Sequence, residues 1–223
     1  MNASSYREAR QRATPADATA SRERPLKELP RPSTARGEAT RRKLLEAAEA
    51  EIGEKGYART SVAGITRRAG VGQGTFYLYF PSKDDALREL VRDMGKRLRH
   101  SLSEATAGAD HRVDVEKRGF KAFLEFAGQN QNLYRVVMES QFVDESIYRE
   151  YYQTLADSYS ANLERAQARG EIRTGHAEAQ AWALMGVAHF LGLRYAIWDQ
   201  SAPSDEVIDT TFDLLFDGLA VKQ

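Results

Sequence analysis

The chain has 223 residues, with 32 Lys and Arg against 32 Asp and Glu, no Cys, and 42% hydrophobic residues. These values are typical of a globular protein of one or two domains. The absence of cysteine excludes a disulfide framework, thiolate metal sites and a Cys nucleophile. The longest nearly apolar run, 181–193, is shorter than the roughly 18–20 residues that span a bilayer, so we expect no membrane span and no membrane partner.

The charge is unevenly distributed along the chain. Residues 1–83 hold 16 basic against 9 acidic side chains, whereas residues 84–223 hold 16 against 23, so the two parts carry +7 and −7. An excess of positive charge at one end indicates an anionic partner such as nucleic acid, and an ordinary solvated surface is the alternative.

Residues 1–36 are predicted to form a flexible basic arm. They are rich in Ala, Arg, Ser and Thr, hold four of the six prolines, and show no apolar periodicity. The segment has no apolar core of a secretory signal, although its Arg-rich start leaves an organelle transit peptide as an alternative. Its arginines are either solvated or add contacts with DNA phosphates or the minor groove.

The segment 37–83 has the pattern of a small three-helix domain. Apolar residues four positions apart predict a first helix that ends near Gly56, and a capped second helix ends at Gly70. A third short helix follows over 72–80. Two helices joined by a tight turn with glycine, here over about 61–80, form the helix-turn-helix layout.

The rest of the chain, 84–223, is predicted to be a larger helical bundle. A capping box at 82–85 opens a long helix with its apolar residues on one face. Further helices are predicted near 113–128, 132–139, 145–169, 176–199 and 204–220, with breaks at glycines and polar runs. The predicted fold class is therefore all-α, with about nine helices.

The segment 60–83, TSVAGITRRAGVGQGTFYLYFPSK, closely resembles the DNA-binding region of the tetracycline-repressor (TetR) family of bacterial transcriptional regulators. The resemblance extends from Glu38 to Asp84 and includes the Gly-Tyr before the second helix, the Ala-Gly-Val turn, and the Gly-Thr-x-Tyr-x-Tyr-Phe of the recognition helix. It implies a helix-turn-helix DNA-binding domain over 37–83 and an effector-binding and dimerisation domain over 84–223. It also implies a cytoplasmic, nucleoid-associated bacterial protein.

The first residues of the recognition helix have the chemistry of base contacts. In a helix-turn-helix, the N-terminal end of the second helix faces base edges in the major groove. Gln73 has an amide that donates and accepts, as adenine recognition requires, and Thr75 offers a hydroxyl and a methyl. Gly74 permits close backbone approach, and Tyr77 lies one turn further on the same side, whereas Phe76 faces the core.

The resemblance further implies contacts with the phosphate backbone, which position the protein without reading sequence. The implied contacts are Thr60, Tyr79 and Lys83. Arg41 and Arg42, with Arg67 and Arg68, are expected to add a sequence-independent positive field, and plain surface charge is the alternative for each.

The family's bundle commonly encloses a cavity for a small effector. The candidates for its lining are aromatic and apolar side chains with one histidine: Phe123, Tyr134, Tyr152, Trp182, Met185 and His189. They favour a hydrophobic or aromatic effector, including an acyl chain, with Arg135 or Arg194 for an anionic end. An ordinary buried core is the alternative, and for His189 a hydrogen-bonded core histidine.

Members of the family usually form homodimers through the last two long helices. The candidates for this interface are Leu193, Ile197, Phe212, Leu215, Phe216 and Leu219. A two-fold dimer would place its recognition helices roughly 34–36 Å apart or at a multiple of this spacing, which predicts a near-palindromic double-stranded DNA operator.

The sequence lacks the usual catalytic motifs. It has no Gly-x-Ser-x-Gly and no His-Glu-x-x-His, and its four histidines lack the spacing of metal ligands. We therefore expect no enzyme, no cofactor and no metal. The predicted function is a sequence-specific repressor that a small hydrophobic or aromatic effector releases from its operator. The alternatives are a nucleoid or cell-division factor of the same fold without an effector, and a helical ligand-binding protein or enzyme that has lost DNA function.

Overall fold

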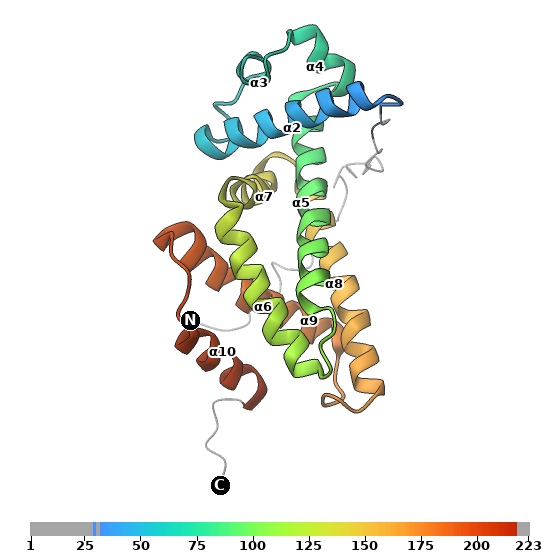
Figure 1. Ribbon diagram of the computed structural model, residues 1–223, viewed down its shortest axis with the longest axis vertical. Coiled ribbons are helices and arrows are strands. Elements are labelled where there is room, and N and C mark those ends of the chain that lie inside the picture. Colours follow the sequence, from blue (N-terminus) through green and yellow to red (C-terminus); the bar gives the residue numbers. More distant parts are fainter. Residues whose placement is uncertain (1–28, 30–31, 218–223) are drawn as a thin grey trace, which may run out of the picture.

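The computed structural model describes Leu29 and residues 32–217, and all regular structure in this part of the chain is helical (Figure 1). The elements are α2 (Ala35–Lys55), α3 (Val62–Ala69), α4 (Gln73–Tyr79), α5 (Lys83–Thr106), α6 (Arg112–Gln129), α7 (Gln131–Val143), α8 (Glu145–Ala168), α9 (Ala177–Gly192), the π-helical η1 (Leu193–Asp199) and α10 (Asp205–Asp217). The predicted all-α fold class is confirmed. Most of the predicted arm, 1–28 and 30–31, lies outside the described residues.

Two helix boundaries differ from the predicted ones. Helix α7 continues to Val143, four residues beyond the predicted end, and only Asp144 separates it from α8. The predicted helix 176–199 is divided into α9 and the wider turns of η1, which end at Gln200 in the left-handed conformation, φ 49°. A segment that is apolar on nearly all sides carries no periodicity from which this change of helix type can be predicted.

Serine side chains cap the N-termini of α3 and α5. The hydroxyl of Ser61 accepts from the Gly64 N–H at 3.1 Å and begins α3, and the hydroxyl of Ser82 accepts from the Asp85 N–H at 3.1 Å and begins α5. Gly70 ends α3 in the left-handed conformation, φ 69°, which side chains other than glycine adopt with strain. The turn between α3 and α4 is therefore defined at both of its ends.

Helices α2, α3 and α4 form a head at one end of the molecule, and α5 runs from this head along the bundle (Figure 1). The head and the bundle share one cluster of buried residues, which includes Leu44, Ile65 and Phe76 in the head and Leu90 and Leu133 beyond it. The head and the bundle therefore do not have separate cores.

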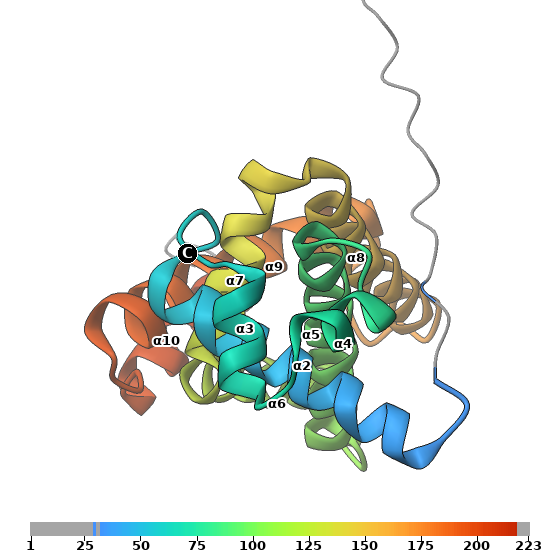
Figure 2. The same ribbon diagram turned by 90° about the horizontal axis from the view of Figure 1, so that it is seen from above.

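The bundle consists of α5 to α10. Figure 2 looks from above, with the head nearest the viewer, and in both views α10 lies on the side of the bundle away from α8. Helix α10 packs through Phe212 against Phe120 of α6, with ring centroids 5.6 Å apart. Across the described ranges, no helix combines the length and the apolar character that a membrane span requires.

Candidate nucleic-acid interface and ligand cavity

Helix α4 has one buried face and one solvent-exposed face. Phe76 is completely buried and packs against Phe80, with ring centroids 5.5 Å apart. Gln73 and Gly74 are exposed, and Tyr77 is 54% exposed. The structure thus brings three of the four predicted base-contacting residues to one open surface at the start of the helix, and the fourth, Thr75, is half-buried.

Leu78 of α4 is 81% exposed, next to Tyr77. The sequence pattern predicts no exposed role for this residue, because a leucine in a short helix is usually part of the core. An exposed leucine on a surface of this kind can pack on a thymine methyl group in the major groove. Its position between Tyr77 and Tyr79, off the Phe76 face, is the signal that a helical wheel would have given.

Lys83, a predicted phosphate contact, is hydrogen-bonded within the head. Its Nζ donates to the carbonyl oxygens of Tyr57 at 2.9 Å and Thr60 at 2.8 Å, and lies 3.9 Å from the centroid of the Tyr57 ring. An ammonium group has three donors, so one N–H of Lys83 is left for a phosphate. Tyr79, another predicted phosphate contact, is half-buried.

Two predicted phosphate contacts, Thr60 and Arg41, are corrected by the structure. Thr60 is 3% exposed and its hydroxyl donates to the Gly56 carbonyl oxygen at 3.0 Å. Arg41 is 9% exposed, forms an ion pair with Glu89 of α5, and lies 5.6 Å from the centroid of the Phe80 ring. Both side chains hold the head together, and sequence alone does not distinguish such a buried polar residue from a surface one.

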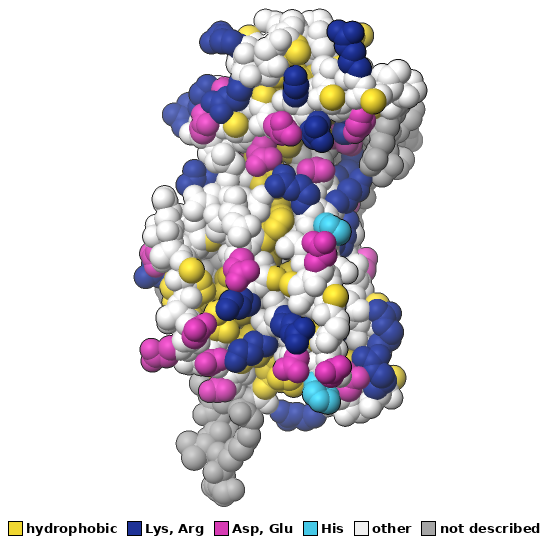
Figure 3. Space-filling model, viewed as in Figure 1, with side chains coloured by type: hydrophobic (Ala, Val, Ile, Leu, Met, Phe, Trp, Pro, Cys, Tyr) yellow, Lys and Arg dark blue, Asp and Glu magenta, His cyan; other side chains and the backbone are white. Residues whose placement is uncertain are grey.

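Several basic side chains remain exposed on the head. Figure 3 shows Lys and Arg on the upper end of the molecule, where Figure 1 places α2, α3 and α4. The exposed ones on and between these helices include Arg36, Arg42, Lys43, Arg59 and Arg67. Arg42 pairs with the exposed Glu46 at 3.7 Å, and Arg68 bridges Glu51 at 3.0 Å and Glu54 at 2.5 Å. The exposed set gives the head a positive surface around α4.

The bundle contains a cavity of about 540 Å³ that is lined by residues of its helices from α5 through to α10. This volume is within the size range of small-molecule sites. Five of the six predicted lining residues, all but Trp182, line the cavity. Trp182 is 41% exposed and instead stacks on the outer side of Tyr152, with ring centroids 6.5 Å apart. Trp182 lies on the same face of α9 as His189, and for this reason the sequence predicts it in the lining. Only part of this face borders the cavity.

Three polar side chains that meet in the cavity wall, Tyr134, Tyr152 and His189, are uncharged at neutral pH. The hydroxyl of Tyr134 donates to the carbonyl oxygen of His189 at 3.0 Å, and the hydroxyls of Tyr134 and Tyr152 lie 3.0 and 3.3 Å from its Nδ1. Burial raises the pKa of both tyrosine hydroxyls and lowers the pKa of the His189 imidazole. This wall offers hydrogen bonds but no charge at neutral pH.

The charged groups at the cavity are different from those that the sequence indicated. Arg135 donates to the Gly53 carbonyl oxygen at 3.4 Å and Arg194 pairs with Asp199, and neither lines the cavity. The arginines that do line it are Arg99 and Arg112. Arg112 forms a buried ion pair with Glu116, whose other carboxylate oxygen accepts from the Tyr159 hydroxyl.

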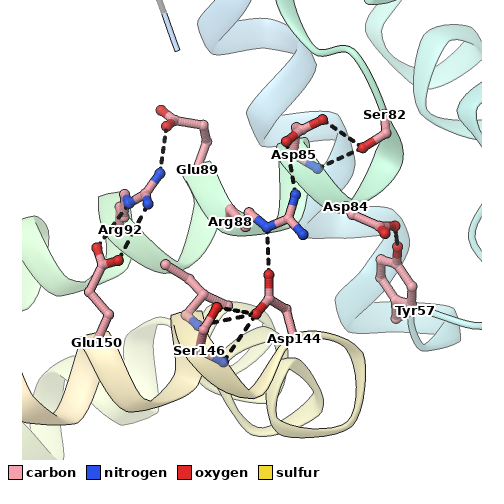
Figure 4. A network of polar contacts seen from close by, with 11 residues as sticks. Tyr57, Ser82, Asp84, Asp85, Arg88, Glu89, Arg92, Asp144, Ser146 and Glu150 are labelled. Atoms are coloured by element: carbon pink, nitrogen blue, oxygen red, sulfur yellow. Dashed lines mark hydrogen bonds and ion pairs between the residues drawn. The ribbon is translucent and has the colours of Figure 1, made fainter. Parts of the chain in front are cut away.

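Ion pairs connect the start of α5 with α8, as Figure 4 shows. Arg92 of α5 donates from Nε to Glu150 of α8 at 2.9 Å and from Nη1 to Glu89 at 3.4 Å. In the head, the Tyr57 hydroxyl donates to Asp84 in the first turn of α5. The helix that lines the cavity is thus joined by polar contacts both to the head and to α8.

The chain matches the family model described as "Bacterial regulatory proteins, tetR family" over residues 44–90. These residues include α3, α4 and the start of α5, the elements that form the exposed surface described above. Over this segment the chain resembles the tetR family. The predicted resemblance is therefore confirmed.

Several solved structures have the same fold as this chain. The fatty acid degradation regulator FadR from Bacillus halodurans is 19% identical with a TM-score of 0.72, over 82% of this chain and 97% of that one. FadR from Bacillus subtilis in complex with stearoyl-CoA is 21% identical with a TM-score of 0.70, over 80% and 99%. Salmonella enterica GusR is 23% identical with a TM-score of 0.71, over 82% and 96%.

The predicted dimer residues differ in exposure. Phe212 is 7% exposed and packs on Phe120 within the chain, and Leu215 lines the cavity, so both belong to the protomer core. Leu193, Ile197 and Phe216 are half-buried, and Leu219 lies outside the described residues. The large exposed apolar side chains of this region include Phe190 at 68%, Trp198 at 65% and Leu214 at 43%.

Within the described part of the chain, no group of three or more His, Asp or Glu side chains is placed to hold a metal ion. The hydroxyls of Tyr134 and Tyr152 lie beside His189 in the cavity wall, and Glu116 of the wall is paired with Arg112. This arrangement is suited to binding a molecule through apolar contacts and a few hydrogen bonds.

Proposed function

We propose that this transcriptional regulator binds a near-palindromic operator as a homodimer and that a small apolar ligand in its cavity changes its affinity for DNA. The observation that carries the proposal is the division of α4. Phe76 is buried in the head core, and this fixes the helix with Gln73, Tyr77 and Leu78 exposed at its surface. A helix held in this way can insert its exposed side into the major groove.

The roles proposed for the exposed residues follow from their chemistry. Gln73 and Tyr77 are proposed to read base edges, with Gly74 and Thr75 at the closest approach of the backbone. Tyr79, Arg42 and the remaining N–H of Lys83 are proposed to bind phosphates, supported by the basic side chains around α4.

A small-molecule ligand is supported by the cavity in the bundle. Its wall is mostly aromatic and aliphatic, and its volume of about 540 Å³ suits a compact apolar molecule or an acyl chain. The fold is shared with a regulator whose structure holds stearoyl-CoA, which is in keeping with a ligand that has a long apolar part.

Dimerisation through the C-terminal helices is supported by exposed aromatic side chains. Phe190 of α9 and Trp198 of η1 are more than 60% exposed, at 68% and 65%, and Leu214 of α10 is exposed at 43%. Large exposed apolar side chains of this kind mark protein interfaces. A two-fold arrangement would present two copies of α4 to successive turns of DNA.

The proposed response depends on α5, because this helix has a role in both parts. Its residues Met94, Leu98 and Leu102 line the cavity, and its first residue, Lys83, is hydrogen-bonded to the head. A ligand that binds one position of α5 more tightly than another shifts the population of head spacings. This is the physical route from the cavity to α4.

The test is selection of fragments of the source genome by the purified protein at about physiological salt, where non-specific phosphate binding is weak. The proposal predicts recovery of one or a few near-palindromic sites beside promoters. Recovery of many unrelated sites would favour a nucleoid factor of the same fold, and no enrichment would contradict the proposed DNA function.

A further inference from the structure

A second, smaller hollow of about 190 Å³ lies on the outer side of the bundle between α5 and α8. It is lined by the side chains of both helices, among them Lys96, Ile147 and Thr154. Two residues, Arg99 and Tyr151, line this outer groove and also the inner cavity. They therefore form the boundary between the mostly apolar cavity and a groove of mixed polar and apolar lining, in which Lys96 and Thr154 are exposed.

Arg99 differs from the other arginines at these hollows. Arg92 pairs with Glu150 at 2.9 Å, and Arg112 pairs with Glu116, so the charges of both are neutralised within the protein. Arg99 is half-buried and makes no ion pair or hydrogen bond with another described residue. A cation that is partly removed from water and lacks a partner is unfavourable unless an anion binds it.

The guanidinium of Arg99 lies close to α5 at Gly95. Its Nη1 is only 3.1 Å from the point where a Cβ on Gly95 would stand, and the ring of Tyr151 is 3.4 Å from the same point. Glycine at position 95 thus leaves room for the guanidinium and the tyrosine ring to meet over α5. The group is held at the boundary instead of extending into solvent.

We propose that Arg99 binds the anionic end of the ligand, whose apolar body fills the inner cavity. The ligand class is an amphipathic anion, with a carboxylate or a phosphate-bearing head in the outer groove beside Lys96. This inference rests on the proposed ligand-responsive function and adds to it the chemistry of the ligand. It replaces Arg135 and Arg194, which the sequence indicated for the anionic end and which lie outside the cavity lining.

The surrounding charges favour an anion over a cation. The outer groove has Arg92, Lys96 and Arg99 against the single carboxylate of Glu150, and that carboxylate is paired with Arg92. On the inner side, Met94, Leu98 and Leu102 of α5 present apolar groups one turn apart. A neutral ligand would fill the apolar chamber and leave Arg99 without a partner.

The test compares probes that share an apolar body and differ in the head: decanol, decanoate and decanoyl-CoA. Their binding to the full-length protein is measured by titration calorimetry for the wild type, Arg99→Gln, Arg99→Lys and the control Arg118→Gln, which changes an exposed arginine outside both hollows. The wild type should bind an anionic probe about tenfold or more tightly than decanol, as expected of a charge-assisted hydrogen bond.

Arg99→Gln should remove this preference without weakening decanol binding, whereas Arg99→Lys should retain part of it and Arg118→Gln all of it. A preference for decanoate indicates a carboxylate head, and a preference confined to decanoyl-CoA indicates a phosphate-bearing head. Equal binding of all three probes, or an unchanged preference in Arg99→Gln, would overturn this inference while the ligand cavity stands. No binding of any probe would overturn both it and the proposed apolar ligand.

Discussion

Arg88 of α5 donates from Nε to the carboxylate of Asp144 at 2.5 Å, and Asp144 is the residue that caps α8. The same guanidinium donates from Nη1 to Asp85 at 2.9 Å, in the first turn of α5 (Figure 4). One side chain therefore joins the start of the helix that leaves the head to the start of a helix of the cavity wall. We expect this contact to couple the head to the ligand cavity.

Arg88→Met should weaken the coupling between ligand and operator. The substitution keeps the aliphatic part of the side chain and removes both ion pairs. The coupling free energy between ligand and operator should therefore fall by about 0.5–2 kcal/mol, which lowers the factor by which a ligand changes operator affinity roughly two- to thirtyfold. Operator affinity with and without ligand measures this factor. Arg149→Met, on the exposed face of α8, is the control, and an equal factor in the wild type and Arg88→Met would refute the assignment.

The contact of Asp144 predicts a dependence of stability on pH. Burial alone would raise the pKa of this carboxyl, but hydrogen bonds from Ser146 and Arg88 outweigh it and lower the pKa. A lowered folded-state pKa gives stability that is complete above the unfolded-state pKa of about 3.9 and is lost as the pH falls through the folded-state value.

Asp144→Asn keeps a residue that caps helices and removes the charge. The melting temperature of the wild type should exceed that of Asp144→Asn by a constant amount at pH 6–7, and the difference should shrink below about pH 4. Asp157→Asn, an exposed position on α8, should show no such trend. A difference that stays constant down to pH 3 would mean that the charge of Asp144 is unimportant.

Glycines at the two ends of the α3–α4 turn should respond in opposite directions to substitution. Gly70 has φ 69°, so Gly70→Ala should lower the free energy of unfolding by about 1 kcal/mol. Gly72 begins α4 with φ −75° and no side-chain cap, and a Cβ there would meet nothing within 4 Å. Gly72→Ser should therefore add a few tenths of a kcal/mol. Urea denaturation of both variants gives the comparison, and a loss of stability in Gly72→Ser would contradict the capping argument.

The neighbours Phe76 and Tyr77 should separate stability from DNA recognition. Phe76→Ala removes a completely buried ring and should lower the free energy of unfolding by about 3–5 kcal/mol. Tyr77→Ala removes an exposed ring and should change it by less than about 0.5 kcal/mol. Denaturant unfolding followed by circular dichroism measures both, and comparable losses would show that α4 is not oriented as described.

The features that the sequence predicts are those that local patterns determine. The burial of Phe76 and the exposure of Tyr77 follow from helical periodicity, and the turn at Gly70 follows from the conformation that glycine favours. The lining by Tyr134 and His189 follows from aromatic and apolar residues on facing helices.

The features that the sequence does not predict depend on partners that are distant in the chain. The burial of Arg41 depends on its ion pair with Glu89, which lies 48 residues away in the sequence. Arg99 cannot be singled out from the sequence, because nothing near it in the chain shows that Glu150 pairs with Arg92 and Glu116 with Arg112. The exposure of Leu78 is not predicted, because an isolated leucine is usually buried.

The most direct test of the central claim is the ratio of affinities for a recovered operator and for unrelated DNA of equal length, at fixed salt. The wild type should prefer its operator by at least about 10³-fold. The double variant Gln73→Ala/Tyr77→Ala should lose most of this preference and keep its affinity for unrelated DNA, because the basic surface around α4 is unchanged. An operator preference in the double variant equal to that of the wild type would contradict the account that α4 reads the DNA.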